Sequence, residues 1–187
     1  MSALSAPRNN SPMKTYLEIK VPIKYDDPWF VRLRNHFSGI PVRWQKDLYH
    51  ITMVFINEAP EGVDLRPVLE KHLSAAHTPV LTFDRLDVFS VKSGMYVIHL
   101  STSHVPERFL ALTEAIRKEM RTAGCVIHSD FMLHVTLGRV RDFNTKLSKL
   151  KRMVGSFSFS PFTLSLTDVD YREFRGRVIY ETLLNMD

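Results

Sequence analysis

The chain lacks several features on which other classes of protein depend. Its 187 residues include a single cysteine, Cys125, which excludes an internal disulfide and agrees with a reducing, cytoplasmic setting. No apolar run approaches the roughly 18 residues that a membrane-spanning helix requires, and residues 1–6 lack the continuous apolar core of a signal peptide. These absences predict a soluble protein that does not bind a membrane.

The patterns of common cofactor sites are also missing. The sequence contains neither a Gly-x-x-x-x-Gly-Lys loop for phosphate nor a glycine-rich dinucleotide fingerprint. Cys125 follows Gly124 without a paired motif, so we interpret it as a small buried residue and not as a nucleophile. We expect no cofactor.

The composition is that of one compact domain, with 44% hydrophobic and 24% charged residues. Residues 1–12 are polar or small and predict a loose tail, and 13–187 form one domain because no Gly-, Ser- or Pro-rich linker divides them. The net charge of +5 mildly favours anionic partners. Basic residues become more frequent towards the C-terminus, where a solvated surface is their simplest interpretation.

Hydrophobic periodicity predicts strands and helices in alternation. The expected helices begin at Asp27, Asp64 and Pro106, and a fourth covers Thr145–Val154. The expected strands are Tyr16–Val21, Val42–Trp44, Leu48–Ile56, Val80–Phe89, Met95–Leu100, Phe131–Val140, Phe157–Val169 and Arg177–Leu184. The last two are expected to form a hairpin around Gly176. This order indicates an α+β domain with two lobes.

Two of these strands carry the same short motif, which reads HITM from His50 and HVTL from His134. Side chains alternate between the faces of a strand, so His50 and Thr52 share one face, roughly 7 Å apart at Cα. His134 and Thr136 share a face in the same way. The opposite, core-facing sets are expected to be Ile51, Met53 and Phe55 in one strand and Leu133, Val135 and Leu137 in the other. Two such strands side by side would line one cleft with two imidazoles and two hydroxyls.

Four other residues each have two interpretations. By strand parity Arg139 falls on the core side, so it reaches the cleft only if the strand ends or twists at Gly138, and a structural salt bridge is an equal alternative. Trp44 is expected to pack, with base stacking as the alternative. His99 is in phase with Met95 and Val97, and a place in the cleft is the less favoured of its two interpretations. For His72 a place on the core edge is expected, with a ligand role as the alternative.

The paired motif resembles that of the 2H phosphoesterase superfamily, and specifically its LigT-like branch, the RNA 2′,3′-cyclic phosphodiesterases or 2′-5′ RNA ligases. Arg43-Trp44 before the first motif is similar to the branch's Arg-Trp lead-in, and Arg139 stands three residues after Thr136 as in its second motif. Met53, Asn57 and Leu133 depart from the usual leucine, glycine and proline. These departures suggest a divergent member with its own substrate.

The resemblance implies a bilobal fold, with two pseudo-symmetric lobes, antiparallel sheets flanking a central cleft, and helices outside. It also implies a hydrolase that opens 2′,3′-cyclic phosphates of RNA or nucleotides to 2′-phosphates, with 2′-5′ ligation as the reverse reaction. His50 would donate a proton to the departing 3′ oxygen and His134 would accept one from water. Thr52 and Thr136, with Arg139 as a further candidate, would bind the phosphate.

Histidine suits both proton-transfer roles because its ordinary pKa is about 6.5. No metal is required, since two histidines without a nearby carboxylate or cysteine are a poor ligand set for zinc. Two alternatives remain open. One is an RNA- or nucleotide-binding module with little turnover, and the other is a 2H enzyme for 2′-5′ oligoadenylate or ADP-ribose cyclic phosphate.

Overall fold

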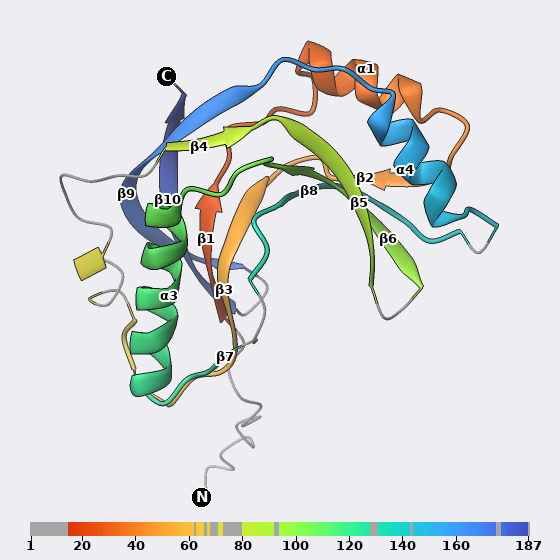
Figure 1. Cartoon of the computed structure of the whole chain (residues 1–187). Helices are drawn as coiled ribbons and strands as arrows, with labels where there is room; N and C mark the ends of the chain where they lie inside the picture. The colour runs from red at the N-terminus through yellow and green to blue at the C-terminus, as the bar shows by residue number, and fades with distance from the viewer. Residues whose placement is uncertain are drawn as a thin grey trace, which may run out of the picture.

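The computed structural model describes residues 15–61, 63–65, 67, 71–72, 80–91, 94–127, 131–142, 144–174 and 177–186. Within them, ten strands form one curved sheet with helices outside it (Figure 1). The main path through the sheet is β4-β9-β10-β1-β3-β8-β6-β5. The N-terminal tail and most of the helix expected from Asp64 lie outside the described residues, so neither prediction is tested. None of the described helices is long and apolar enough to cross a membrane.

The first lobe contains one half of this sheet and the longest helix. Its strands are β1 (Thr15–Lys20), β3 (His50–Glu58), β4 (Val80–Phe83), β7 (Val126–Ile127), β9 (Phe162–Phe174) and β10 (Arg177–Met186), and its helix is α3 (Glu107–Thr122). β9 and β10 pair antiparallel, which confirms the expected hairpin. β1 pairs parallel to β10 and antiparallel to β3, so the lobe is not wholly antiparallel.

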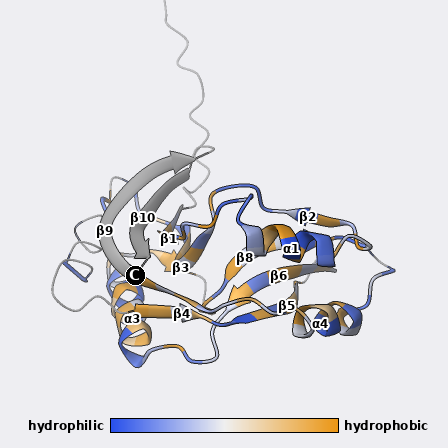
Figure 2. Ribbon diagram, turned by 90° about the horizontal axis from the view of Figure 1, so that it is seen from above, coloured by the Kyte–Doolittle hydropathy of each residue, from blue (hydrophilic) through white to orange (hydrophobic). Residues whose placement is uncertain are grey.

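The second lobe contains the other half-sheet and two shorter helices. Its strands are β2 (Val42–Trp44), β5 (Arg85–Val91), β6 (Met95–Ser101) and β8 (Val135–Val140), and its helices are α1 (Pro28–His36) and α4 (Leu147–Gly155). A hydrogen bond of 2.9 Å between His36 Nε2 and the Met153 carbonyl joins the two helices. Viewed from above, α3 lies at one end of the molecule and α4 at the other (Figure 2). The predicted bilobal α+β fold is confirmed.

The chain crosses between the lobes at Asp84. The run expected as one strand over Val80–Phe89 is two strands, because β4 pairs with β9 in the first lobe and β5 with β6 in the second. The Asp84 carboxylate accepts hydrogen bonds from the Ser103 amide, at 2.7 Å, and from the Ser103 hydroxyl. These bonds hold the pKa of Asp84 below its ordinary value. The two strands at the ends of the sheet, β4 and β5, are therefore consecutive in the chain and are connected by Asp84 alone.

The core follows the apolar stripes that the sequence predicts. Phe30, Leu33 and Phe37 are buried beneath α1, and Phe109, Ile116 and Met120 are buried beneath α3. Backbone amides in the first turn of a helix have no intrahelical acceptor, so Pro28, which has no N–H, is well suited to begin α1. Cys125 is also buried, and burial raises the pKa of its thiol, which confirms its interpretation as a packing residue.

Both motif strands deviate from simple alternation at the same place, directly after the motif threonine. β3 holds one residue more than β1, because Leu17 pairs with Val54 but Glu18 pairs with Thr52. β8 holds one residue more than β6, because Ile98 pairs with Gly138 but His99 pairs with Thr136. Such a β-bulge shifts the following side chains to the other face. The matched positions show that the two lobes are pseudo-symmetric.

Because of the bulges, two side chains do not face the core as expected. Phe55, expected in the core with Ile51 and Met53, is only partly buried and stacks on Tyr16 with ring centroids 6.0 Å apart. Arg139, placed by parity on the core side, is exposed. The second motif strand is also shorter than expected, because β8 begins at Val135 and His134 lies just before it.

Gly138 allows β2 to lie against β8. A Cβ at this position would lie 2.7 Å from Val42 Cγ1 and 2.8 Å from Trp44 Cε3, closer than packed carbon atoms approach. Trp44 itself packs edge-on against Phe30 and Phe37, at centroid distances of 5.6 and 5.8 Å, which confirms its packing role.

Replacing Gly138 by alanine is therefore expected to lower the free energy of unfolding by about 1–3 kcal/mol, because the methyl group overpacks the β2–β8 contact. Urea unfolding measures the change. Gly39→Ala is the matched control, since a Cβ there meets no atom within 4 Å. Equal effects of the two substitutions would contradict this account.

Candidate active site

The two motifs lie side by side where the lobes meet. β3 and β8 are antiparallel and pair through Ile51 and Val135, both fully buried. Continuing this register by one residue in each direction sets His50 opposite Thr136 and Thr52 opposite His134. Side chains opposite each other across a pair of strands point to the same face. The structure thus brings together the four residues that the sequence singled out.

Both motif histidines are oriented by their own backbone. His50 Nδ1 donates to the Leu48 carbonyl at 2.7 Å, and His134 Nδ1 donates to the Met132 carbonyl at 2.9 Å. A carbonyl can only accept, so each Nδ1 carries a hydrogen and Nε2 is left for other partners. Leu48 takes the left-handed conformation, with φ of 54°, which is unfavourable for leucine. Strain of this kind persists where the surrounding structure holds it in place.

His50 has a carboxylate beside it. Glu18 Oε2 lies 3.5 Å from His50 Nδ1, and the Glu18 side chain is only 1% exposed. The ring of Tyr16 stacks on His50 at a centroid distance of 5.8 Å. The His50 ring thus lies between a buried carboxylate and an aromatic ring.

His134 lies in contrasting surroundings, against two rings. Phe89 meets it edge-on at 5.4 Å and His99 at 5.7 Å between centroids. Burial, followed by the charges of His50 and Arg139, lowers the pKa of His134. The neutral form of this imidazole is therefore favoured.

His99, for which the sequence allowed a place in the cleft, lies behind His134 and is only 4% exposed. It pairs with Thr136 across β6 and β8, the position that Glu18 takes beside Thr52 in the other lobe. Burial lowers the pKa of His99 to about 4, so it is uncharged near neutral pH. An uncharged ring can pack against His134 without repelling its proton.

An open cleft of about 780 Å³ extends from His50 towards β2 and the end of β8. It is lined by Tyr16, Glu18, Arg43, Trp44, Gln45, Lys46, Asp47, Leu48, His50, Met95, Arg139 and Arg141. Arg139 Nη1 donates to Gln45 Oε1 at 3.4 Å, and no ion pair of Arg139 is found among the described residues. Of its two interpretations, the structure therefore favours the cleft over the salt bridge.

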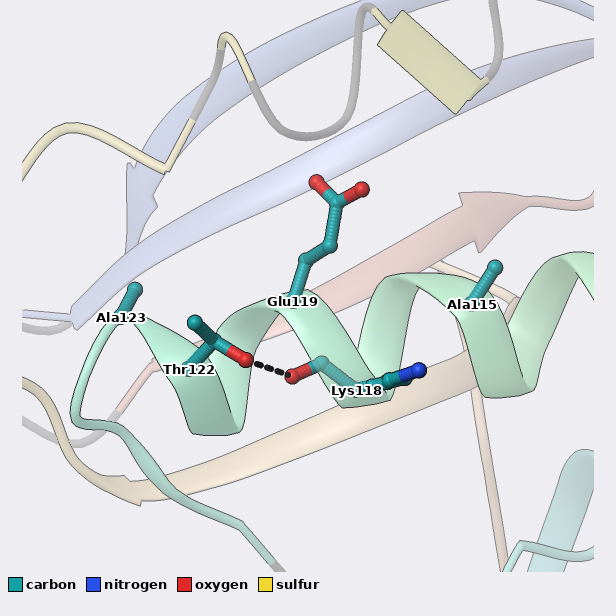
Figure 3. Close-up of a pocket in the computed structure, with 5 residues that line it drawn as sticks. All are labelled: Ala115, Lys118, Glu119, Thr122 and Ala123. Carbon is teal, nitrogen blue, oxygen red and sulfur yellow. Dashed lines mark hydrogen bonds between the residues drawn. The ribbon is translucent and has the colours of Figure 1, made fainter.

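A second hollow lies on α3, apart from the motifs, and is lined by Ala115, Lys118, Glu119, Thr122 and Ala123 (Figure 3). Lys71 Nζ and His72 Nε2 each lie 2.8 Å from Glu119 Oε1. These two contacts hold the pKa of Glu119 below its ordinary value. His72 thus serves the packing of α3, and this hollow has no part in the candidate site.

No role was predicted from the sequence for Glu18 or Phe89. Glu18 could have been identified from the sequence, because it is an acidic residue between the apolar Leu17 and Ile19 in a short strand. Phe89 could not have been identified from the sequence, because its contact with His134 depends on a pairing of strands that the sequence does not predict.

Because His99 is buried and uncharged, the free energy of unfolding should depend on pH. Its folded-state pKa of about 4 lies below the ordinary 6.5, so the unfolded chain takes up a proton first as the pH falls. The free energy of unfolding should therefore drop between about pH 6.5 and 4, by about 3 kcal/mol from this residue. Urea unfolding across this range should show a smaller drop in His99→Phe than in the wild type. Parallel curves for the two proteins would contradict the assignment.

Comparisons with known proteins agree with this geometry. The family described as LigT like Phosphoesterase matches residues 100–180, which supports a phosphoesterase. No curated protein sequence matches the chain. Solved structures with the same fold include Escherichia coli LigT in the apo form and complexed with 3′-AMP, with TM-scores of 0.54 and 0.52. Each is 16% identical to this chain, and the match covers 94% of this chain and 97% of LigT.

The family match includes α3, the second motif and α4, while the structural match covers 94% of the chain. Both agree with the resemblance stated from the paired motifs. The chain is therefore similar to LigT-like phosphoesterases over residues 100–180 and shares the fold of E. coli LigT.

Proposed function

We propose that the protein is a metal-independent phosphodiesterase that opens 2′,3′-cyclic phosphates of RNA or nucleotides to 2′-phosphates. The observation that carries this proposal is the register at Ile51 and Val135, which sets each motif histidine opposite the threonine of the other motif. A phosphate between the strands would meet one imidazole and one hydroxyl from each side.

The proposed reaction needs one base and one acid. His134 Nε2 takes a proton from water, and the water oxygen attacks phosphorus. The bond from phosphorus to the 3′ oxygen breaks, and His50 Nε2 supplies the proton that this oxygen requires. The hydroxyls of Thr52 and Thr136 donate to the phosphoryl oxygens as negative charge increases on them. In the reverse, ligating direction the two histidines exchange roles.

The surroundings of the histidines support this assignment of roles. Glu18 Oε2 lies 3.5 Å from His50 Nδ1, so a buried carboxylate is placed beside the histidine that acts as the acid. Burial lowers the pKa of His134 and favours a neutral imidazole that can act as the base. Pairs of titratable groups whose environments favour opposite states are typical of acid–base sites.

The ligand class rests on the cleft and on the comparisons. The cleft volume of about 780 Å³ is within the range of small-molecule sites and suits a nucleotide. Solved structures of E. coli LigT are complexed with 3′-AMP, ATP and NADP+, which supports nucleotides as ligands of this chain.

Two alternatives differ from this proposal in a measurable way. A binding module would retain a cyclic nucleotide without forming product. A 2H enzyme for 2′-5′ oligoadenylate or ADP-ribose cyclic phosphate would leave simple cyclic nucleotides nearly unchanged. A panel of these phosphodiesters, assayed side by side, separates the three cases.

The proposal predicts that the purified protein hydrolyses 2′,3′-cyclic nucleotides in the presence of EDTA. Replacing His50 or His134 by alanine should lower kcat by at least about 100-fold, the usual contribution of a general acid or base. Product formation, followed by chromatography, measures the loss, and circular dichroism checks the fold.

His104→Ala is the matched control, because His104 is an exposed histidine outside the cleft. The control should retain the activity of the wild type. Full activity in both motif variants would show that the proposal is wrong.

The role of Glu18 predicts a change in pH dependence. Charged and titratable groups around His50 include Glu18 and Lys20 on β1, His134 across the junction, and Arg43, Lys46, Asp47, Arg139 and Arg141 along the cleft. Replacing Glu18 by glutamine removes the negative charge nearest to His50 in this set. The high-pH limb of the kcat profile should therefore move in Glu18→Gln, because the charge beside the proposed proton donor has changed.

Glu58→Gln is the control for this experiment, because Glu58 is an exposed carboxylate at the end of β3. It should leave the profile in place. A high-pH limb that stays unmoved in Glu18→Gln would contradict the positioning role of Glu18.

A further inference from the structure

Three arginines line the same cleft as His50, and we call Arg43, Arg139 and Arg141 the arginine cluster. Arg43 and Arg139 are direct partners in the β2–β8 register. Arg141 follows Arg139 by two residues along the chain. Like charges directly opposite each other in a sheet are destabilising. The fold therefore keeps an arrangement that costs free energy in the absence of a neutralising group.

The described residues do not supply that group. Arg139 Nη1 donates to the neutral Gln45 side chain at 3.4 Å, and Arg141 Nε lies 3.5 Å from the Met95 thioether. Of the two carboxylates that line the cleft, Glu18 lies beside His50, and no ion pair joins the arginine cluster to Asp47 in the described part of the chain. Partial burial, and then the charges of Arg43 and Arg141, lower the pKa of Arg139.

Phosphate is the anion that this arrangement fits. The planar guanidinium group donates two parallel hydrogen bonds to phosphate oxygens, and several arginines together bind phosphate more strongly than one. The three side chains are exposed, so a ligand can reach them. The cleft connects them to His50 in one continuous space of about 780 Å³, which accommodates a nucleotide.

We infer that the arginine cluster binds a second phosphate of the substrate, separate from the phosphate that reacts between the two motifs. This inference rests on the proposed function for the position of the reacting phosphate. Such a site favours substrates that carry one phosphate at the reacting end and a second phosphate at a distance of one nucleoside. Two chemical sources fit: the 5′-phosphate of a nucleotide, or the phosphodiester that joins the last nucleoside to an RNA chain.

Equilibrium binding of product-like ligands tests the site without requiring turnover. Isothermal calorimetry would compare adenosine 2′-phosphate, adenosine 2′,5′-bisphosphate and the dinucleotide ApA carrying a 2′-phosphate at its end. The wild type should bind at least one of the two ligands with a second phosphate about tenfold or more tightly than adenosine 2′-phosphate. Whichever of the two shows the gain identifies the source of the second phosphate.

The variants Arg43→Gln and Arg141→Gln should each lower that gain by about tenfold, which corresponds to about 1.4 kcal/mol. Arg139 is left intact because its charge also acts on His134. Arg152→Gln, an exposed arginine on α4, removes the same charge away from the cleft and should leave the gain unchanged. Because repulsion is relieved, neither cluster variant should lower the melting temperature, whereas a structural role would lower it.

Equal affinity of the wild type for all three ligands would overturn the inference, as would an unchanged gain in both cluster variants. The same proteins assayed with the matching 2′,3′-cyclic phosphates test the proposed function separately. A binding gain without turnover would support the second-phosphate site and contradict the phosphodiesterase. Turnover without a binding gain would do the reverse.

Discussion

The candidate site depends on the short junction between β3 and β8. Ile51 and Val135 pair there, and both are fully buried. Full burial of such side chains contributes about 1.5–3 kcal/mol each, and the position of each strand is set by the core of its own lobe. The distance between the two histidines is therefore a property of how the lobes meet, and a change in either core is transmitted to the site.

The lobes repeat a scaffold but differ in the residues around the histidines. Each motif threonine has a cross-strand neighbour from the outer side of its lobe: Glu18 beside Thr52 and His99 beside Thr136. One is a buried carboxylate, and the other is an uncharged imidazole with a pKa of about 4. A nearly symmetric arrangement thus places the two histidines in different electrostatic surroundings, and pairs of titratable groups in different environments are typical of acid–base sites.

Two parts of the cleft offer different kinds of group to a bound phosphate. Near the junction, hydroxyls and imidazoles provide neutral donors and exchangeable protons, which suit a phosphate whose charge changes during a reaction. Further along β8, fixed guanidinium charges provide attraction that is the same before and after reaction. In the second-phosphate site that we infer, binding of this kind would position a substrate and select its length without changing in the transition state.

The sequence alone determined the motifs, the order of the elements and the sharing of a face by each histidine and threonine, because these follow from local period-two and helical patterns. Tertiary structure decided the rest. The bulge after each threonine, which turns Phe55 and Arg139 away from the core, exists only relative to a partner strand. The division of Val80–Phe89 between the lobes and the approach of Glu18 to His50 likewise depend on pairings between distant segments. No local pattern records such pairings, since their energy comes from residues far apart in the chain.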